Sequence, residues 1–198
     1  STSINIKYDQ CLSLIPHIIP KKKEWNEFKR KFRVQLNELY TQAYDFKGFL
    51  LPPEDEGINP FEGGYPLHPI TLYALDRLSK KVAQNERTFF TYLASDEDYS
   101  LFYLLEKMNL NEFHFIGLDA IYDYFEENIY SYRGGEAREI YKKYQVAINK
   151  LGLGVEKTVQ IRVLKAMAVI YIINDAGTLA SDEETLVNVI DADKEIVK

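Results

Sequence analysis

Apolar residues recur at three- and four-residue steps along most of this chain, and this spacing constrains the fold more than any other feature. An α-helix places residues three and four apart on one face, so such spacing predicts amphipathic helices. The first clear set predicts one helix that runs to about Phe46, with these residues on its apolar face: Trp25, Phe28, Phe32, Leu36, Leu39, Tyr40 and Ala43. No alternating run is strong enough to indicate a large sheet.

Later segments repeat the helical spacing. The expected helices are 69–83, a short helix through 89–93, then 99–107, 118–129, 136–151, 155–176 and a last short helix at 186–190. Pro69 suits a first helical turn, and Gly177 is expected to end its helix. Ser95-Asp96-Glu97-Asp98 and Ser181-Asp182-Glu183-Glu184 have the form of capping boxes.

These patterns predict an all-α fold, a multi-helix bundle with a winged-helix-like or helix-turn-helix C-terminal part. Three segments are expected. An N-terminal arm and amphipathic helix occupy 1–57, a helical domain occupies 58–154, and a winged-helix-like segment, expected to be truncated, occupies 155–198. Pro16 and Pro20 favour a strand or extended arm over 4–19, and clustered Pro and Gly at 51–64 indicate a linker.

Composition limits the class of protein. A chain of 198 residues with 46% hydrophobic and 14% aromatic residues can bury a core. It has no apolar run near the roughly 18 residues that span a bilayer, so no membrane is expected as a partner. The single Cys11 cannot form an internal disulfide, which favours a reducing cytoplasm. The chain lacks an initial Met and stops abruptly, so we expect a piece of a longer polypeptide.

Nucleic-acid binding is possible but has little support. The net charge of −6 argues against it, although residues 21–33 carry seven cations and two acids. That basic helix could lie along phosphates, but its aromatics fall on the core stripe, which favours a solvated charged face. The last two expected helices could read DNA, yet the second begins Asp182-Glu183-Glu184, which phosphates would repel.

Catalytic motifs are missing. The sequence has no P-loop, no Gly-x-Ser-x-Gly elbow, and no zinc-protease or calcium-loop pattern. His17, His68 and His114 are scattered without ligand spacing, so no metal site is expected. The chain is therefore expected not to be an enzyme by itself.

The segment YPLHPITLYALDRLSKKVAQNERTFFTYLAS, residues 65–95, resembles the block that follows the nucleotide-binding core in large bacterial P-loop ATPases of the AAA/STAND kind, including those of phage-defence systems. GLDAIYDYFEENIY and RVLKAMAVIYIIND are similar to their helical lid and winged-helix-like region. The resemblance covers roughly 59–190 and makes 58–154 lid-like.

The resemblance implies a non-catalytic helical region that couples nucleotide state to the handling of a partner or nucleic acid. ATP and Mg would belong to the parent protein, an ATPase whose core in the same polypeptide would be the partner. Arg87 is the candidate that reaches the terminal phosphate, with Asn85, Glu86 and His68 as supporting candidates. The polar residues before Phe89 further predict that Arg87 lies at the exposed start of the short helix, whose aromatic residues anchor it in the core.

Each assignment has an alternative. Arg87 could instead pair with Glu86 or Asp96 or cap a neighbouring helix, and His68 is favoured as a hydrogen-bonded packing residue. The alternative function is a free-standing helical module that docks another protein through an aromatic-rich surface. An enzyme of unrecognised kind is the weakest hypothesis.

Overall fold

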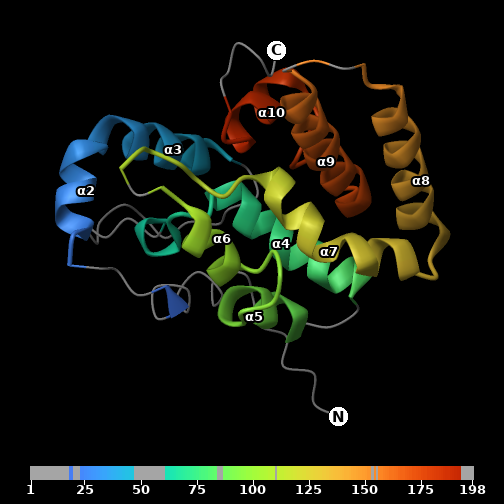
Figure 1. Cartoon of the computed structure of the whole chain (residues 1–198), viewed down its shortest axis with the longest axis horizontal. Coiled ribbons are helices and arrows are strands. Elements are labelled where there is room, and N and C mark those ends of the chain that lie inside the picture. The colour runs from blue at the N-terminus through green and yellow to red at the C-terminus, as the bar shows by residue number, and fades with distance from the viewer. Residues whose placement is uncertain are drawn as a thin grey trace.

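Helix α4, Pro69–Val82, lies at the centre of the molecule and is surrounded by other helices (Figure 1). Eleven of its 14 residues are buried, so it contacts neighbours on nearly every side. Its first turn starts with Pro69, whose fixed φ suits that position. The computed structural model describes residues 18–19, 23–46, 61–83, 87–109, 111–152, 154 and 156–192.

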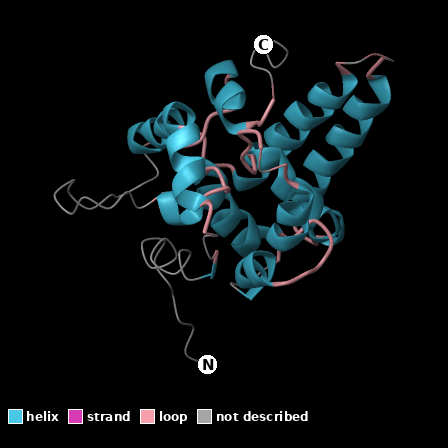
Figure 2. Cartoon of the chain, turned by 60° about the vertical axis from the view of Figure 1, so that its left-hand side comes forward, coloured by secondary structure: helices cyan, strands magenta, loops and turns pink. Residues whose placement is uncertain are grey.

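Most of the described part of the chain is helical, as Figure 2 shows, and the predicted all-α multi-helix fold is confirmed. The only β-type pairing there is an isolated parallel bridge between Leu67 and Ile116. The other elements are α2 (Trp25–Lys31), α3 (Arg33–Asp45), η2 (Glu62–Gly64), α5 (Arg87–Ala94), α6 (Leu101–Lys107), α7 (Leu118–Ser131), α8 (Gly135–Lys150), α9 (Lys157–Ile173) and α10 (Glu183–Val189).

Helices α7 and α9 complete the centre of the bundle, because α4 packs against both and they pack against each other. Helix α8 lies along α9 on one side of the molecule, and α2 and α3 lie on the opposite side (Figure 1). One continuous hydrophobic cluster of buried residues runs through α3 to α10, and Trp25 and Phe28 of α2 pack against it. The three expected segments therefore share one core, and their boundaries stay predictions.

The single helix predicted from Trp25 to about Phe46 is wrong in one respect, because it breaks at Phe32. The backbone there leaves helical geometry, with φ −108° and ψ 27°. The buried Phe32 ring packs on Phe28 and Phe113, with centroids 4.7 and 5.8 Å away. Since Phe113 is distant in sequence, the break accompanies a tertiary contact that periodicity does not contain.

The predicted apolar face is only partly buried. Leu36 and Leu39 are buried with Phe32, whereas Trp25 and Phe28 remain partly exposed. Trp25 Nε1 donates a 3.2 Å hydrogen bond to Glu62. The basic face is exposed at Arg30 as predicted, but Lys29 forms a 2.7 Å ion pair with the same Glu62 carboxylate.

Two predicted helix starts are shifted. Ser100, rather than Ser95, caps α6 by accepting the Tyr103 N–H, because Tyr99 adopts a left-handed φ of 63° and turns the chain just before it. Asp182, rather than Ser181, caps α10 by accepting the Thr185 N–H at 2.8 Å.

The predicted end of the long C-terminal helix is also corrected. Asn174, with φ 56°, ends α9 before Gly177 is reached. Asparagine tolerates the left-handed conformation that such an end requires.

The expected N-terminal arm, linker and C-terminal wing stay predictions. The strand or arm expected over 4–19 lies outside the described residues except for Ile18 and Ile19, and most of the 51–64 linker lies outside them too. Through residue 192 the described segments contain no strand that would form a wing, and the winged-helix assignment stays a prediction.

Candidate functional site

Arg87 is the first residue of α5, and its side chain is exposed. The predicted exposed start of a short helix is therefore confirmed. Asn85 and Glu86 lie outside the described residues. Within the described segments, Arg87 forms no ion pair, so the alternative pairing with Asp96 is not made.

The other residues of α5 pack against the core and fix the position of the helix that carries Arg87. Phe89, Tyr92 and Leu93 are buried on the inner face of the helix. The Tyr92 ring meets the ring of Tyr124 in α7 edge-on, with centroids 5.0 Å apart. Burial raises the pKa of the Tyr92 phenol far above its usual value, and its hydroxyl has no hydrogen-bond partner in the described structure. Apolar packing therefore anchors this helix.

His68 is a packing residue at the start of α4. It is fully buried and caps the helix, with Nδ1 accepting the Ile70 N–H at 3.1 Å. Its Nε2 lies 3.5 Å from Oε1 of Gln42. Burial lowers the pKa of His68 to about 3, so the ring is neutral near pH 7. His68 precedes α4 and Arg87 follows it, so the helix separates these two candidates rather than bringing them together.

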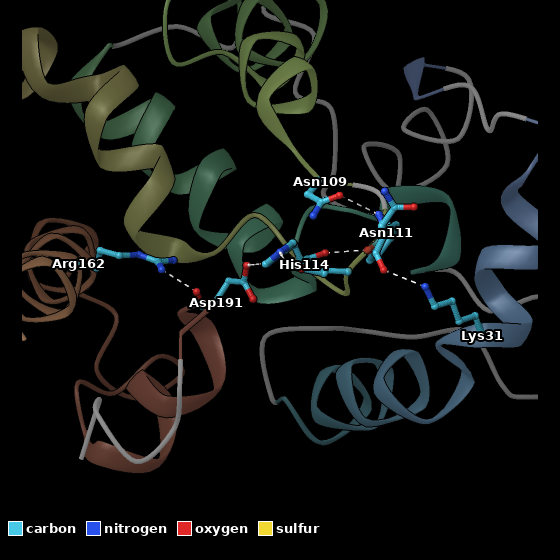
Figure 3. A network of polar contacts seen from close by, with 8 residues as sticks. Lys31, Asn109, Asn111, His114, Arg162 and Asp191 are labelled. Atoms are coloured by element: carbon cyan, nitrogen blue, oxygen red, sulfur yellow. Dashed lines mark hydrogen bonds and ion pairs between the residues drawn. The ribbon is translucent and has the colours of Figure 1, made fainter. Parts of the chain in front are cut away.

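A polar network that sequence analysis missed joins α7, α9 and the end of α10. Figure 3 shows the part in which Arg162 of α9 meets Asp191 after α10. At its centre, Arg162 of α9 donates from Nε to Oδ2 of Asp119 at 2.6 Å. Its second donor, a terminal guanidinium nitrogen, reaches the carbonyl oxygen of Asp191 at 2.6 Å. One guanidinium thus ties the start of α7 to the chain that leaves α10.

Asp119 carries a carboxylate into the core. Its side chain is buried, and Oδ1 accepts no hydrogen bond from a described residue. Burial raises the pKa of Asp119, although the charge and hydrogen bond of Arg162 act in the opposite direction. Gly117 is closely packed at this point. A Cβ added to it would lie 2.8 Å from Oδ1 of Asp119 and 2.4 Å from the carbonyl oxygen of Val189.

His114 extends the network to the surface. Its Nδ1 lies 2.8 Å from Oδ2 of Asp191, and its Nε2 lies 3.2 Å from Oε2 of Glu112. Its carbonyl oxygen accepts the Tyr65 hydroxyl at 2.7 Å. Burial disfavours the charged ring, but the hydrogen bonds and charges of the two carboxylates outweigh this and raise the pKa of His114.

The sequence did carry a signal for the buried part of this network. Arg162 and Lys165 are spaced by one turn within an otherwise apolar segment, and Asp119 and Asp123 are spaced by one turn in an earlier helix. In the structure the second pair also forms, with Lys165 Nζ 2.5 Å from Asp123. The spacing of these charges is thus a signal that α7 and α9 could pair, but it does not specify which acid meets which cation.

These side chains form hydrogen bonds and ion pairs that join α7, α9 and the end of α10. No group of three or more His, Cys, Asp or Glu in the described segments is arranged to hold a metal ion. No described helix is both long and apolar enough to cross a membrane.

Searches of protein-family models, curated proteins and solved structures each find no match to this chain.

Proposed function

We propose that this chain is a helical region of a larger P-loop ATPase, without catalytic activity of its own. In this proposal it lies after the nucleotide-binding core, and couples the nucleotide state to the handling of a partner or nucleic acid. ATP and Mg bind the core, and Arg87 reaches toward the terminal phosphate.

The observation that carries the proposal is the setting of Arg87. Its guanidinium is exposed and without an ion pair among the described residues, while three buried side chains hold the helix below it. A guanidinium stabilises phosphate charge best when its position is fixed before the nucleotide arrives. The setting of Arg87 thus supports a role toward an anion outside this chain.

The decisive experiment measures ATP turnover by the intact parent polypeptide with Arg87→Ala. We expect a loss of at least one order of magnitude, since arginines that contact the transferred phosphoryl group contribute about 10³ to 10⁵ in rate. The melting temperature should hardly change, because the side chain is exposed. Arg133→Ala is the matched control, an exposed arginine in the α7–α8 loop. Equal turnover in both variants would remove Arg87 from the mechanism.

The coding sequence upstream in the same reading frame provides an earlier test. A P-loop there supports the ATPase proposal. Its absence supports the second candidate function, a free-standing module that docks another protein.

The surface of α7 and α8 favours that second candidate. Tyr130 is 56% exposed, the Tyr141 ring lies 5.5 Å from it, and the Arg138 guanidinium lies 5.9 Å from its centroid. Tyrosine and arginine dominate binding energy at many protein interfaces. Tyr130→Ala should then weaken capture of the partner at least tenfold, as expected for loss of an interface anchor.

A further inference from the structure

The end of α10 is held against the start of α7 by contacts of two kinds. Val189 and Ile190 are buried, and their backbone lies so close to Gly117 that a Cβ there would meet the Val189 oxygen at 2.4 Å and the Ile190 Cα at 3.3 Å. Asp191 follows directly, and its polar groups bind Arg162 and His114. The position of Asp191 therefore determines whether the two apolar side chains before it stay covered.

His114 faces charged or polar groups from several elements. Arg162, with Asp119 behind it, holds the backbone of Asp191, and Lys31 Nζ binds the nearby Asn111 carbonyl oxygen at 2.8 Å (Figure 3). The groups that face His114 itself are the carboxylates of Asp191 and Glu112 and the hydroxyl of Tyr65. Both ring nitrogens thus meet a carboxylate.

The number of ring protons decides how many of these contacts survive. A protonated imidazole has two N–H donors and bonds both carboxylates, with a favourable charge. A neutral imidazole has one N–H, so one carboxylate faces a lone pair and the charge attraction to both is lost. Deprotonation of His114 therefore weakens its hold on Asp191.

We propose that His114 and Asp191 form a proton-dependent clasp, which holds the end of α10 on the start of α7 and opens more often once His114 loses its proton. This clasp stands independently of the ATPase proposal, because it uses only residues of the described chain.

The direction of the pH effect follows from the raised pKa of His114. The protonated His114 ring contributes its full stabilisation to the closed state below the ordinary histidine pKa of 6.5. This contribution is lost as the pH rises through the higher pKa that His114 has in the closed state. The ion pair between Arg162 and Asp119 does not involve His114 or Asp191, so it continues to join α7 and α9. Opening is therefore local to the end of α10 and does not unfold the bundle.

The test combines two measurements on the whole chain between pH 5.5 and 9. Imidazole NMR spectra give the pKa of His114 in the native protein and in Asp191→Asn. Hydrogen exchange of the α10 amides, corrected for the intrinsic rate at each pH, gives the opening equilibrium. If the clasp exists, the equilibrium constant for opening increases with pH. The expected factor is ten raised to the difference between the pKa of His114 in the native protein and its pKa in Asp191→Asn.

His114→Gln, which cannot titrate, should abolish this pH dependence while α10 remains folded at every pH. His68 is an internal control, because its pKa of about 3 places its titration below the range. The clasp is refuted if Asp191→Asn leaves the pKa of His114 unchanged, or if corrected exchange in α10 is the same at pH 5.5 and pH 9.

Discussion

Replacing Arg162 by Leu tests how much the buried network contributes to stability. The variant removes the 2.6 Å hydrogen bond to Asp119 and the 2.6 Å bond to the Asp191 carbonyl oxygen. Asp119 would then remain in the core with neither carboxylate oxygen bonded to a side chain of the described structure. Removal of one partner from a buried ion pair costs about 3–5 kcal/mol, because the other charge stays desolvated.

Lys165→Leu is the matched control on the same helix. Its pair with Asp123 has a similar length, 2.5 Å, but both side chains reach solvent, at 20% and 26% exposure. Water can rehydrate Asp123 when the lysine is lost. We therefore expect a smaller loss of about 1 kcal/mol, the upper end for solvent-accessible pairs.

The loss in free energy of unfolding caused by Arg162→Leu should depend on pH. Burial already raises the pKa of Asp119 above its ordinary 3.8, and loss of Arg162 removes the main opposing contribution. A carboxyl group whose pKa is higher in the folded state than in the unfolded state binds more protons when folded. Stability therefore falls as the pH rises from the unfolded-state pKa through the folded-state pKa. The deficit relative to native protein is thus larger at pH 7 than at pH 4.

Urea unfolding followed by circular dichroism measures both effects, provided that the slopes with denaturant agree among the variants. Adding Asp119→Asn to Arg162→Leu should restore part of the stability and abolish the pH dependence, because the amide carries no charge. The reasoning is refuted if Arg162→Leu costs no more than Lys165→Leu, or if its deficit is the same at pH 4 and pH 7.

Three further outcomes are expected. The chain alone should show no binding of Mg-ATP by calorimetry, since it lacks a phosphate cradle; micromolar affinity would contradict the proposed function. Gly117→Ala should lower the free energy of unfolding by about 1–3 kcal/mol, because its Cβ would meet the Val189 oxygen; Gly135→Ala, with open space around it, should cost nothing. Tyr92→Phe should be nearly neutral, since the removed hydroxyl is unpartnered, whereas Tyr73→Phe, which loses a 2.5 Å hydrogen bond to a carboxylate, should cost about 1.5–3 kcal/mol.

Part of the candidate site followed from local sequence alone. The polar residues before Phe89 predicted an exposed Arg87, and the helical spacing after it predicted a buried base. His68 was favoured as a packing residue, and its burial agrees with that. The network around Arg162 did not follow, because its members come from separate segments without a common motif.

The sequence by itself determined the all-α class and nearly all of the helices, since apolar spacing of three and four residues is a local property that burial of one helix face requires. The tertiary structure decided where those helices break and which charges meet. The helix break at Phe32 accompanies the packing of its ring against Phe113. Arg162 pairs with Asp119 across 43 residues of sequence. Such pairings depend on how α7 and α9 pack against each other, and local periodicity alone does not fix that arrangement.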